Sequence, residues 1–149
     1  MKKVLVDLNI ILDVLLDRDP FAREAEWLWT MAESGAIKAY ISGTSVTNLS
    51  YILQRALGTK KAKKVLEDVL KVFRVAKVDQ TVITEAIRLS YRDFEDAVQE
   101  ASARHEKLEA IISRNKKDFR SSEIPVYTAS EYVALLNLPI PNSRERASS

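Results

Sequence analysis

Short apolar runs alternate with longer segments of helical periodicity along most of this chain, and this pattern limits the fold more than any other feature. The first run, residues 3–7, is apolar until it ends at a carboxylate, and residues 9–16 then have the length and apolar density of a helix. Strands that alternate with helices predict a mostly parallel sheet with helices on both faces and right-handed crossovers. Further strands are expected over residues 37–41, 73–75, 110–113 and 125–127.

Caps and breakers set the expected helix boundaries. Asp19 and Pro20 open the second helix, with proline in its first turn, and Gly35 ends it. Asp79 and Asp93 have the character of N-caps. We expect helices over residues 9–16, 20–34, 46–56, 60–70, 79–91 and 130–137, and one that starts at residue 93 with an apolar stripe through residue 101. A turn is expected over residues 42–45 and a polar loop over residues 114–123.

Composition restricts the chemistry available to the chain. Its 149 residues suit one compact domain. The absence of cysteine excludes disulfides and thiolate metal sites, so a metal would be held by oxygen or by the single imidazole, His105. We expect His105 to be an exposed bystander. Asp13, within the first helix, is expected either to be solvated or ion-paired, or to make a structural contact near the pocket.

The N-terminal segment does not have the pattern of a membrane signal. Its apolar run meets Asp7 and Asp13 too early for a signal peptide or a membrane span. We therefore expect a cytoplasmic protein that does not contact membranes. The formal charge is only +2, so contacts to nucleic acid would need local basic patches.

Acidic residues fall where two of the expected strands end. Asp7 follows the first strand, and Asp118 comes shortly after the fourth. Because ligands in parallel α/β folds bind at the carboxyl ends of the strands, both should open onto the same edge of the sheet. A helix can supply a third carboxylate, since Asp96 lies three residues after the cap Asp93, about 300° around a helix, and shares its face.

Carboxylates that converge in one cleft repel one another at neutral pH unless a cation neutralises them. Mg²⁺ or Mn²⁺ is the natural occupant, because hard cations prefer oxygen ligands. Such an ion can generate hydroxide and stabilise charge on a phosphodiester, so no histidine or serine nucleophile is needed.

Three short blocks then follow one another in a recognisable order. They are VDLNIILD at residues 6–13, DFEDA at residues 93–97 and ISRNKKDF at residues 112–119. In this order and spacing they resemble the signature blocks of PIN domains, particularly the branch that includes VapC-like toxins. The resemblance spans residues 3 to about 137.

The resemblance implies a three-layer α/β/α PIN-like fold, with a central, mostly parallel sheet of about five short strands and helices on both faces. One PIN-like domain would cover residues 1–138, with a flexible C-terminal tail over residues 139–149. It also implies an endoribonuclease that depends on Mg²⁺ or Mn²⁺. Asp7 would be the metal ligand after the first strand, Asp96 the ligand on the helix, and Asp118 the acidic residue that closes the last block.

Two amides stand where the family often has carboxylates. Family members commonly have a glutamate in the helix after the second strand, where this chain has Asn48. Asn115 occupies a position that is often aspartate, although this branch often has asparagine there. An amide oxygen can ligate a hard cation but brings no negative charge. The alternative function is therefore a catalytically degenerate PIN module that binds RNA or protein without cleavage.

The resemblance also implies partners. The leading hypothesis is the toxin of a type II toxin–antitoxin pair, with an RNA substrate, a small antitoxin protein that holds it inactive, and a homodimeric state.

Two other acidic-pocket α/β classes are disfavoured. A haloacid dehalogenase-type phosphatase needs Asp-x-Asp after the first strand, where this chain has Asp7-Leu8-Asn9, and a receiver domain needs a phospho-acceptor after its third strand, where Lys77 offers none.

Basic residues form two groups that are candidates for holding RNA phosphates. The first group follows the second strand, and its plain interpretation is a solvated helix face. The second group adjoins the expected site and is nearer the chemistry. The first consists of Arg55, Lys60, Lys61, Lys63 and Lys64, and the second of Arg114, Lys116 and Lys117.

Overall fold

The computed structural model describes residues 2–119 and 122–136. A five-stranded sheet with the order β3-β2-β1-β4-β5 runs through the described chain, and every neighbouring pair of strands is parallel. This confirms the expected parallel sheet. The strands are β1 (Lys2–Val6), β2 (Ile37–Ser42), β3 (Phe73–Ala76), β4 (Ala110–Ile112) and β5 (Val126–Tyr127).

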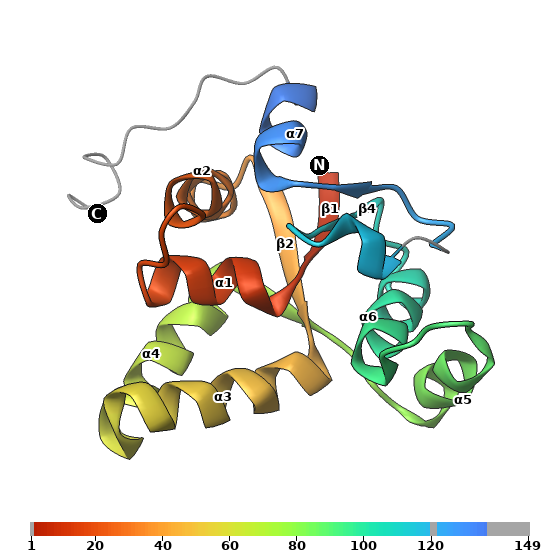
Figure 1. Cartoon of the computed structure of the whole chain (residues 1–149), viewed down its shortest axis with the longest axis horizontal. Helices are drawn as coiled ribbons and strands as arrows, with labels where there is room; N and C mark the ends of the chain where they lie inside the picture. The colour runs from red at the N-terminus through yellow and green to blue at the C-terminus, as the bar shows by residue number, and fades with distance from the viewer. Residues whose placement is uncertain (1, 120–121, 137–149) are drawn as a thin grey trace.

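Helices connect the strands in the expected alternation, and Figure 1 shows them on both sides of the sheet. The helices are α1 (Leu8–Leu15), α2 (Ala22–Glu33), α3 (Gly43–Leu57), α4 (Thr59–Val72), α5 (Gln80–Arg88), α6 (Phe94–His105) and α7 (Ala129–Leu135), with a short 3-10 helix, η1 (Lys116–Phe119), after β4.

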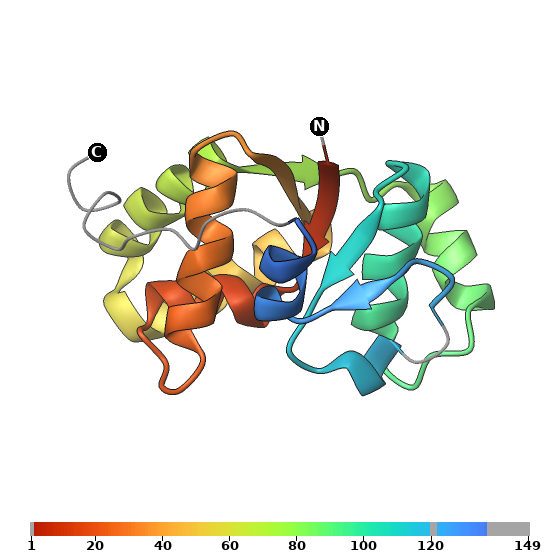
Figure 2. The same cartoon turned by 90° about the horizontal axis from the view of Figure 1, so that it is seen from above.

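Alternating side chains of the strands bury both faces of the sheet. Val4 and Val6 belong to the larger core, together with residues of α1, α2, α3, α4 and α7. Leu5 points the other way, into a smaller core that includes Ala103 of α6. Figure 2 shows the strands between these two groups of helices. The structure is therefore the three-layer α/β/α arrangement that the sequence predicts.

Several local boundaries differ from the expectations; α5, for example, ends at Arg88 rather than near residue 91. Residues 43–45 are the first turn of α3 rather than a separate turn, and Ser42 is its cap position. Pro20 lies in a turn, and α2 begins two residues later at Ala22. The predicted polar loop contains η1, because Phe119 is buried against the smaller core and fixes this segment.

The predicted caps are confirmed. The Asp79 side chain accepts a hydrogen bond from the backbone of Val82, and the Asp93 side chain accepts from Glu95 and Asp96. The predicted tail, residues 139–149, lies outside the described residues. None of the helices within the described ranges has the length and apolar content needed to cross a membrane.

A buried ion pair ties α1 to the segment after β4. Asp13 is 1% exposed, and Nε of Arg114 lies 3.0 Å from its Oδ2. The Arg114 guanidinium also lies over the Phe21 ring, 4.0 Å from the ring centroid. Arg18 is a second, more distant cation for Asp13, at 3.8 Å. Of the roles predicted for Asp13, it has the ion pair.

Candidate active site

Asp7 stands directly after β1, where the chain turns into α1. Its side chain is only 6% exposed, and Ser113 at the end of the neighbouring strand donates a hydrogen bond to its Oδ2 at 2.8 Å. The backbone N–H of Asn115 donates in turn to the Ser113 hydroxyl at 3.1 Å. The parallel pairing of β1 with β4 thus holds this carboxylate at the carboxyl edge of the sheet.

The start of α6 supplies further carboxylates. Asp93 accepts hydrogen bonds from the N–H groups of Glu95 and Asp96, at 2.8 and 3.3 Å. Acidic side chains in the first turn of a helix are favoured by the helix dipole. The cap therefore stabilises this end of the helix and fixes the direction from which Asp96 approaches the site.

A buried amide lies between the carboxylate after β1, Asp7, and the carboxylate on α6, Asp96. Gln99 is 1% exposed, and its Nε2 donates to Oδ1 of Asp96 at 3.3 Å. The Gln99 amide also opposes the rise in the pKa of Asp7, so it acts on both carboxylates. Its Oε1 has no hydrogen-bond partner among the described residues. Asp7 and Asp96 are thus brought together, as the sequence predicts.

An open cavity of about 720 Å³ lies over this arrangement. Asp93, Asp96 and Asp118 contribute its acidic side chains, and Asp118 reaches it from η1. The whole lining consists of Ser90, Tyr91, Arg92, Asp93, Asp96, Lys117 and Asp118. Two cations therefore flank the carboxylates at the cavity surface, a suitable arrangement for a polyanion whose phosphate must approach an acidic site.

Mutual repulsion is visible in the electrostatics of the site. Desolvation by burial, followed by the negative charges of Asp93, Asp7, Asp118 and Glu95, raises the pKa of Asp96 to about 7. Burial also raises the pKa of Asp7, against the hydrogen bonds from Ser113 and Gln99. Close carboxylates that shift each other in this way have lower free energy when a cation lies between them.

The donor set fits a hard divalent cation. Among the described residues, no three acidic or histidine side chains lie close enough together to enclose an ion as they stand. Mg²⁺ does not require such a cage, because proteins commonly hold it with one or two carboxylates, waters and substrate phosphate. Asp7 and Asp96 supply that minimum, and the unpartnered Oε1 of Gln99 lies beside them as a further oxygen.

Asn48 faces a carboxylate that the sequence analysis did not single out. Its Nδ2 donates to Oε2 of Glu95 at 2.8 Å, and the Ser45 hydroxyl donates to Oε1 of Glu95 at 3.5 Å. The contact joins α3 to the first turn of α6. The amide nitrogen of Asn48 is thus directed at Glu95.

The candidate RNA-binding residues are dispersed. Lys117 lines the cavity, whereas Lys116 beside it is paired with Glu131 at 3.1 Å. Arg114 is held in the ion pair with Asp13. Arg55 is exposed on α3, seven residues beyond Asn48, or about 10 Å along the helix from the contact with Glu95. Of the predicted set, Lys117 therefore lies nearest the carboxylates.

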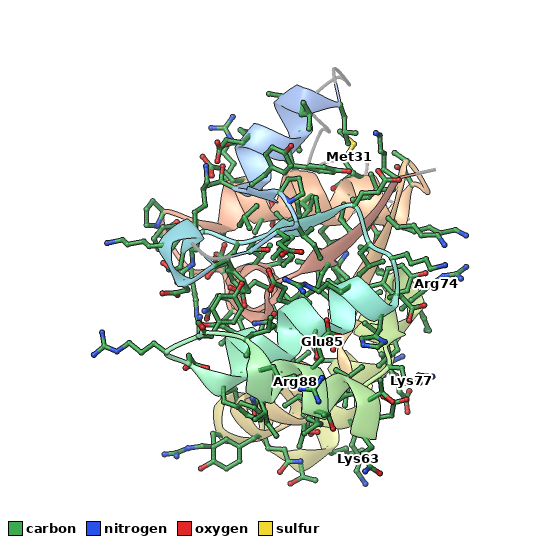
Figure 3. All side chains as sticks on the ribbon, turned by 90° about the vertical axis from the view of Figure 1, so that its right-hand side faces the viewer. Met31, Lys63, Arg74, Lys77, Glu85 and Arg88 are labelled. Carbon is green, nitrogen blue, oxygen red and sulfur yellow. The ribbon has the colours of Figure 1, made fainter. Side chains whose placement is uncertain are left out.

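His105 lies far from this site. It ends α6, nine residues or about 13 Å beyond Asp96. The His105 ring contacts Glu85 of α5. Figure 3 labels Glu85 on the face of the molecule formed by α5 and α6. The prediction of a bystander is correct for the site but incomplete, since His105 has this partner on α5.

Sequence reasoning missed four residues around the carboxylates: Arg92, Glu95, Gln99 and Ser113. Gln99 had a detectable signal, because it follows Asp96 by three residues and so shares its helix face. Ser113 directly follows β4, in the same segment as the expected site residue Asp118. The Glu95 contact with α3 had no sequence signal, since the partners are 47 residues apart.

The fold and the site together define an α/β protein with a carboxylate site at the carboxyl edge of a parallel sheet. The family model for the PIN domain matches residues 3–117. The chain therefore belongs to the PIN domain family, as the three sequence blocks predicted.

Similar proteins include enzymes and toxin–antitoxin assemblies. Ribonuclease VapC1 of Aquifex aeolicus (strain VF5) is 26% identical over 136 residues, which cover 88% of this chain and 93% of the relative. A toxin-antitoxin complex from Klebsiella pneumoniae contains a chain that is 25% identical, with a TM-score of 0.63 and coverage of 85% of this chain and 97% of that one. VapBC-1 from nontypeable Haemophilus influenzae shares the fold at 13% identity, with a TM-score of 0.67 and coverage of 86% and 98%.

Proposed function

We propose that this protein is a divalent-metal-dependent endoribonuclease of the VapC toxin type. The observation that carries the proposal is the pair of carboxylates, Asp7 and Asp96, which act on each other at the edge of an open acidic cavity. The likeness to Ribonuclease VapC1 over most of both chains supports the same activity.

Asp7, Asp96 and Asp118 would hold Mg²⁺ or Mn²⁺. When bound, the ion supplies Lewis-acid charge and an acidified water for attack on a phosphodiester. Ser113 orients the Asp7 carboxylate and Gln99 the Asp96 carboxylate, each by donating a hydrogen bond. Asn115 contributes through its backbone N–H, which holds the Ser113 hydroxyl in place.

The similar toxin–antitoxin complexes support a small antitoxin as the partner of this chain. RNA as the substrate, a homodimeric state and a cytoplasmic location remain part of the proposal. The degenerate binding module is the competing account, motivated by Asn48 and Asn115, because these amides bring no negative charge to positions where the family often has carboxylates.

Controlled expression in a bacterium tests the toxin proposal. Induction of the wild-type chain should arrest growth and fragment a defined set of RNAs, whereas induction of Asp96→Asn to the same protein level should do neither. Arrest by both proteins, with intact RNA, would favour the binding module, because binding without cleavage does not require the Asp96 charge.

Lys117 and Lys116 form a matched pair for testing the RNA contact. Lys117→Ala should weaken the binding of single-stranded RNA and reduce the slope of log K against log salt by about 0.7, the value for one phosphate contact. Lys116→Ala should have a smaller effect on the RNA affinity and on the salt slope, because Lys116 is paired with Glu131. Binding should be measured with Asp96→Asn in the background, so that the RNA stays intact. Equal effects of the two substitutions would remove Lys117 from the proposed phosphate contacts.

A further inference from the structure

Both oxygens of the Glu95 carboxylate are held by α3. Oε2 accepts a hydrogen bond from Nδ2 of Asn48 at 2.8 Å, and Oε1 accepts one from the Ser45 hydroxyl at 3.5 Å. A carboxylate only accepts hydrogen bonds, so both α3 side chains must present donors to it. The two donors fix the direction of the Glu95 side chain across the gap between the helices.

These contacts orient the Glu95 charge without neutralising it. Asn48 and Ser45 are neutral, and within residues 2–119 and 122–136 no lysine or arginine forms an ion pair with Glu95. Glu95 is only partly exposed, so its charge is partly removed from water. It also acts on its neighbour, since it is one of the charges that raise the pKa of Asp96.

Successive residues on a helix point about 100° apart, which separates Glu95 from Asp96 around α6. Asp96 lines the cavity and binds Gln99, whereas Glu95 is turned toward α3. The two side chains therefore approach the carboxyl edge of the sheet from two directions. Gln99, which is 1% exposed, lies next to the Asp96 carboxylate, and its unpartnered Oε1 is a second sign that these side chains form a ligand site.

We propose that Glu95 is a further carboxylate of the metal site, and that Asn48 and Ser45 are its positioning residues. This inference rests on the proposed function, because it concerns the same metal. It assigns to α6 the negative charge that Asn48 does not bring to α3. A contact that served only to join the two helices would not need an ionised group, since two amides can also form a hydrogen bond.

Mn²⁺ affinity, measured without RNA, separates the charge from the contact. The amount of free Mn²⁺ is read from its electron paramagnetic resonance signal during titration of the full chain. Glu95→Gln keeps a hydrogen-bonding group of the same size but removes the charge. The double variant Asn48→Asp/Glu95→Gln exchanges the amide and the carboxylate, so it returns the charge to the same contact and preserves the hydrogen bond. Asp96→Asn serves as the reference for loss of the site.

Glu95→Gln should bind Mn²⁺ about 10- to 100-fold more weakly than the wild type, as expected when a group that supports a metal is removed. The double variant should recover most of that loss, while urea denaturation shows all variants folded. An affinity of Glu95→Gln within twofold of the wild type would overturn the inference, and so would a double variant that binds no better than Glu95→Gln. If Asp96→Asn loses Mn²⁺ while Glu95→Gln does not, this inference alone is wrong. A wild type that binds no Mn²⁺ would overturn the proposed function as well.

Discussion

Changing Asp96 to asparagine should lower the rate of Mn²⁺-dependent RNA cleavage on the order of 100- to 1,000-fold, the loss typical when one preorganised group that stabilises transition-state charge is removed. The same change should make the metal-free protein more stable at neutral pH. Asp96 lies among Asp93, Asp7, Asp118 and Glu95, which repel its charge. An amide of the same size removes that repulsion, so activity and stability should move in opposite directions.

The direction of the stability change follows from the pKa of Asp96. The folded-state pKa of Asp96 is about 7, above its ordinary value of 3.8. Between these values the folded protein holds a proton that the unfolded chain has released, so Asp96 lowers the free energy of unfolding as pH rises from about 4 to 7. Above this range Asp96→Asn should be more stable by about 1 kcal/mol, after allowance for solvent screening of a partly exposed group.

Urea denaturation in EDTA between pH 4 and pH 8 checks the stability effect, and single-turnover cleavage checks the activity. Asp68→Asn is a suitable control, because Asp68 is an exposed carboxylate on α4 whose pKa is lowered by Lys64 and Lys71. That control should leave cleavage unchanged. Parallel pH profiles for the wild type and Asp96→Asn would contradict the repulsion at the site.

Arg114→Ala should reduce the free energy of unfolding by about 3 kcal/mol, because it leaves the carboxylate of Asp13 buried without its closest cation. Asp13 is 1% exposed, and burial raises its pKa despite the opposing charge of Arg114. Arg18 remains at 3.8 Å but is partly exposed and cannot replace the close contact. The substitution also removes the guanidinium from the Phe21 ring.

Two comparisons isolate the cause of this loss. Lys116→Ala removes a neighbouring cation from an exposed pair with Glu131 and should cost less than about 1 kcal/mol. The double variant Asp13→Leu/Arg114→Met should recover much of the stability lost in Arg114→Ala, because it leaves no buried charge. If the double variant is no more stable than Arg114→Ala, the unpaired Asp13 charge is not the cause. If Arg114→Ala is as stable as the wild type, the ion pair has no structural role.

The strands and the family could be predicted because their signals are local. The apolar run before Asp7 and the caps Asp79 and Asp93 depend on residues close together in the sequence, and the structure confirms all three. The short blocks around Asp7 and Asp96 likewise predicted the family that the comparisons show.

The remaining features depend on contacts between distant segments. Arg114 was expected at the RNA surface, but its partner Asp13 lies 101 residues earlier and comes near only when β4 pairs with β1. Asn48 was predicted from its own position in the sequence, whereas its nearest partner is Glu95 on another helix. No periodicity or spacing in a single sequence reports which side chains meet between two helices.

The most direct test of the metal-dependent nuclease is cleavage of a structured RNA pool by purified wild type and Asp96→Asn, prepared in parallel and assayed with Mn²⁺, Mg²⁺ or EDTA. Cleavage by the wild type with Mn²⁺ or Mg²⁺, its loss in EDTA, and its absence from Asp96→Asn in every condition are the predicted results. Cleavage that persists in EDTA, or that both proteins catalyse equally, would contradict the carboxylate metal site.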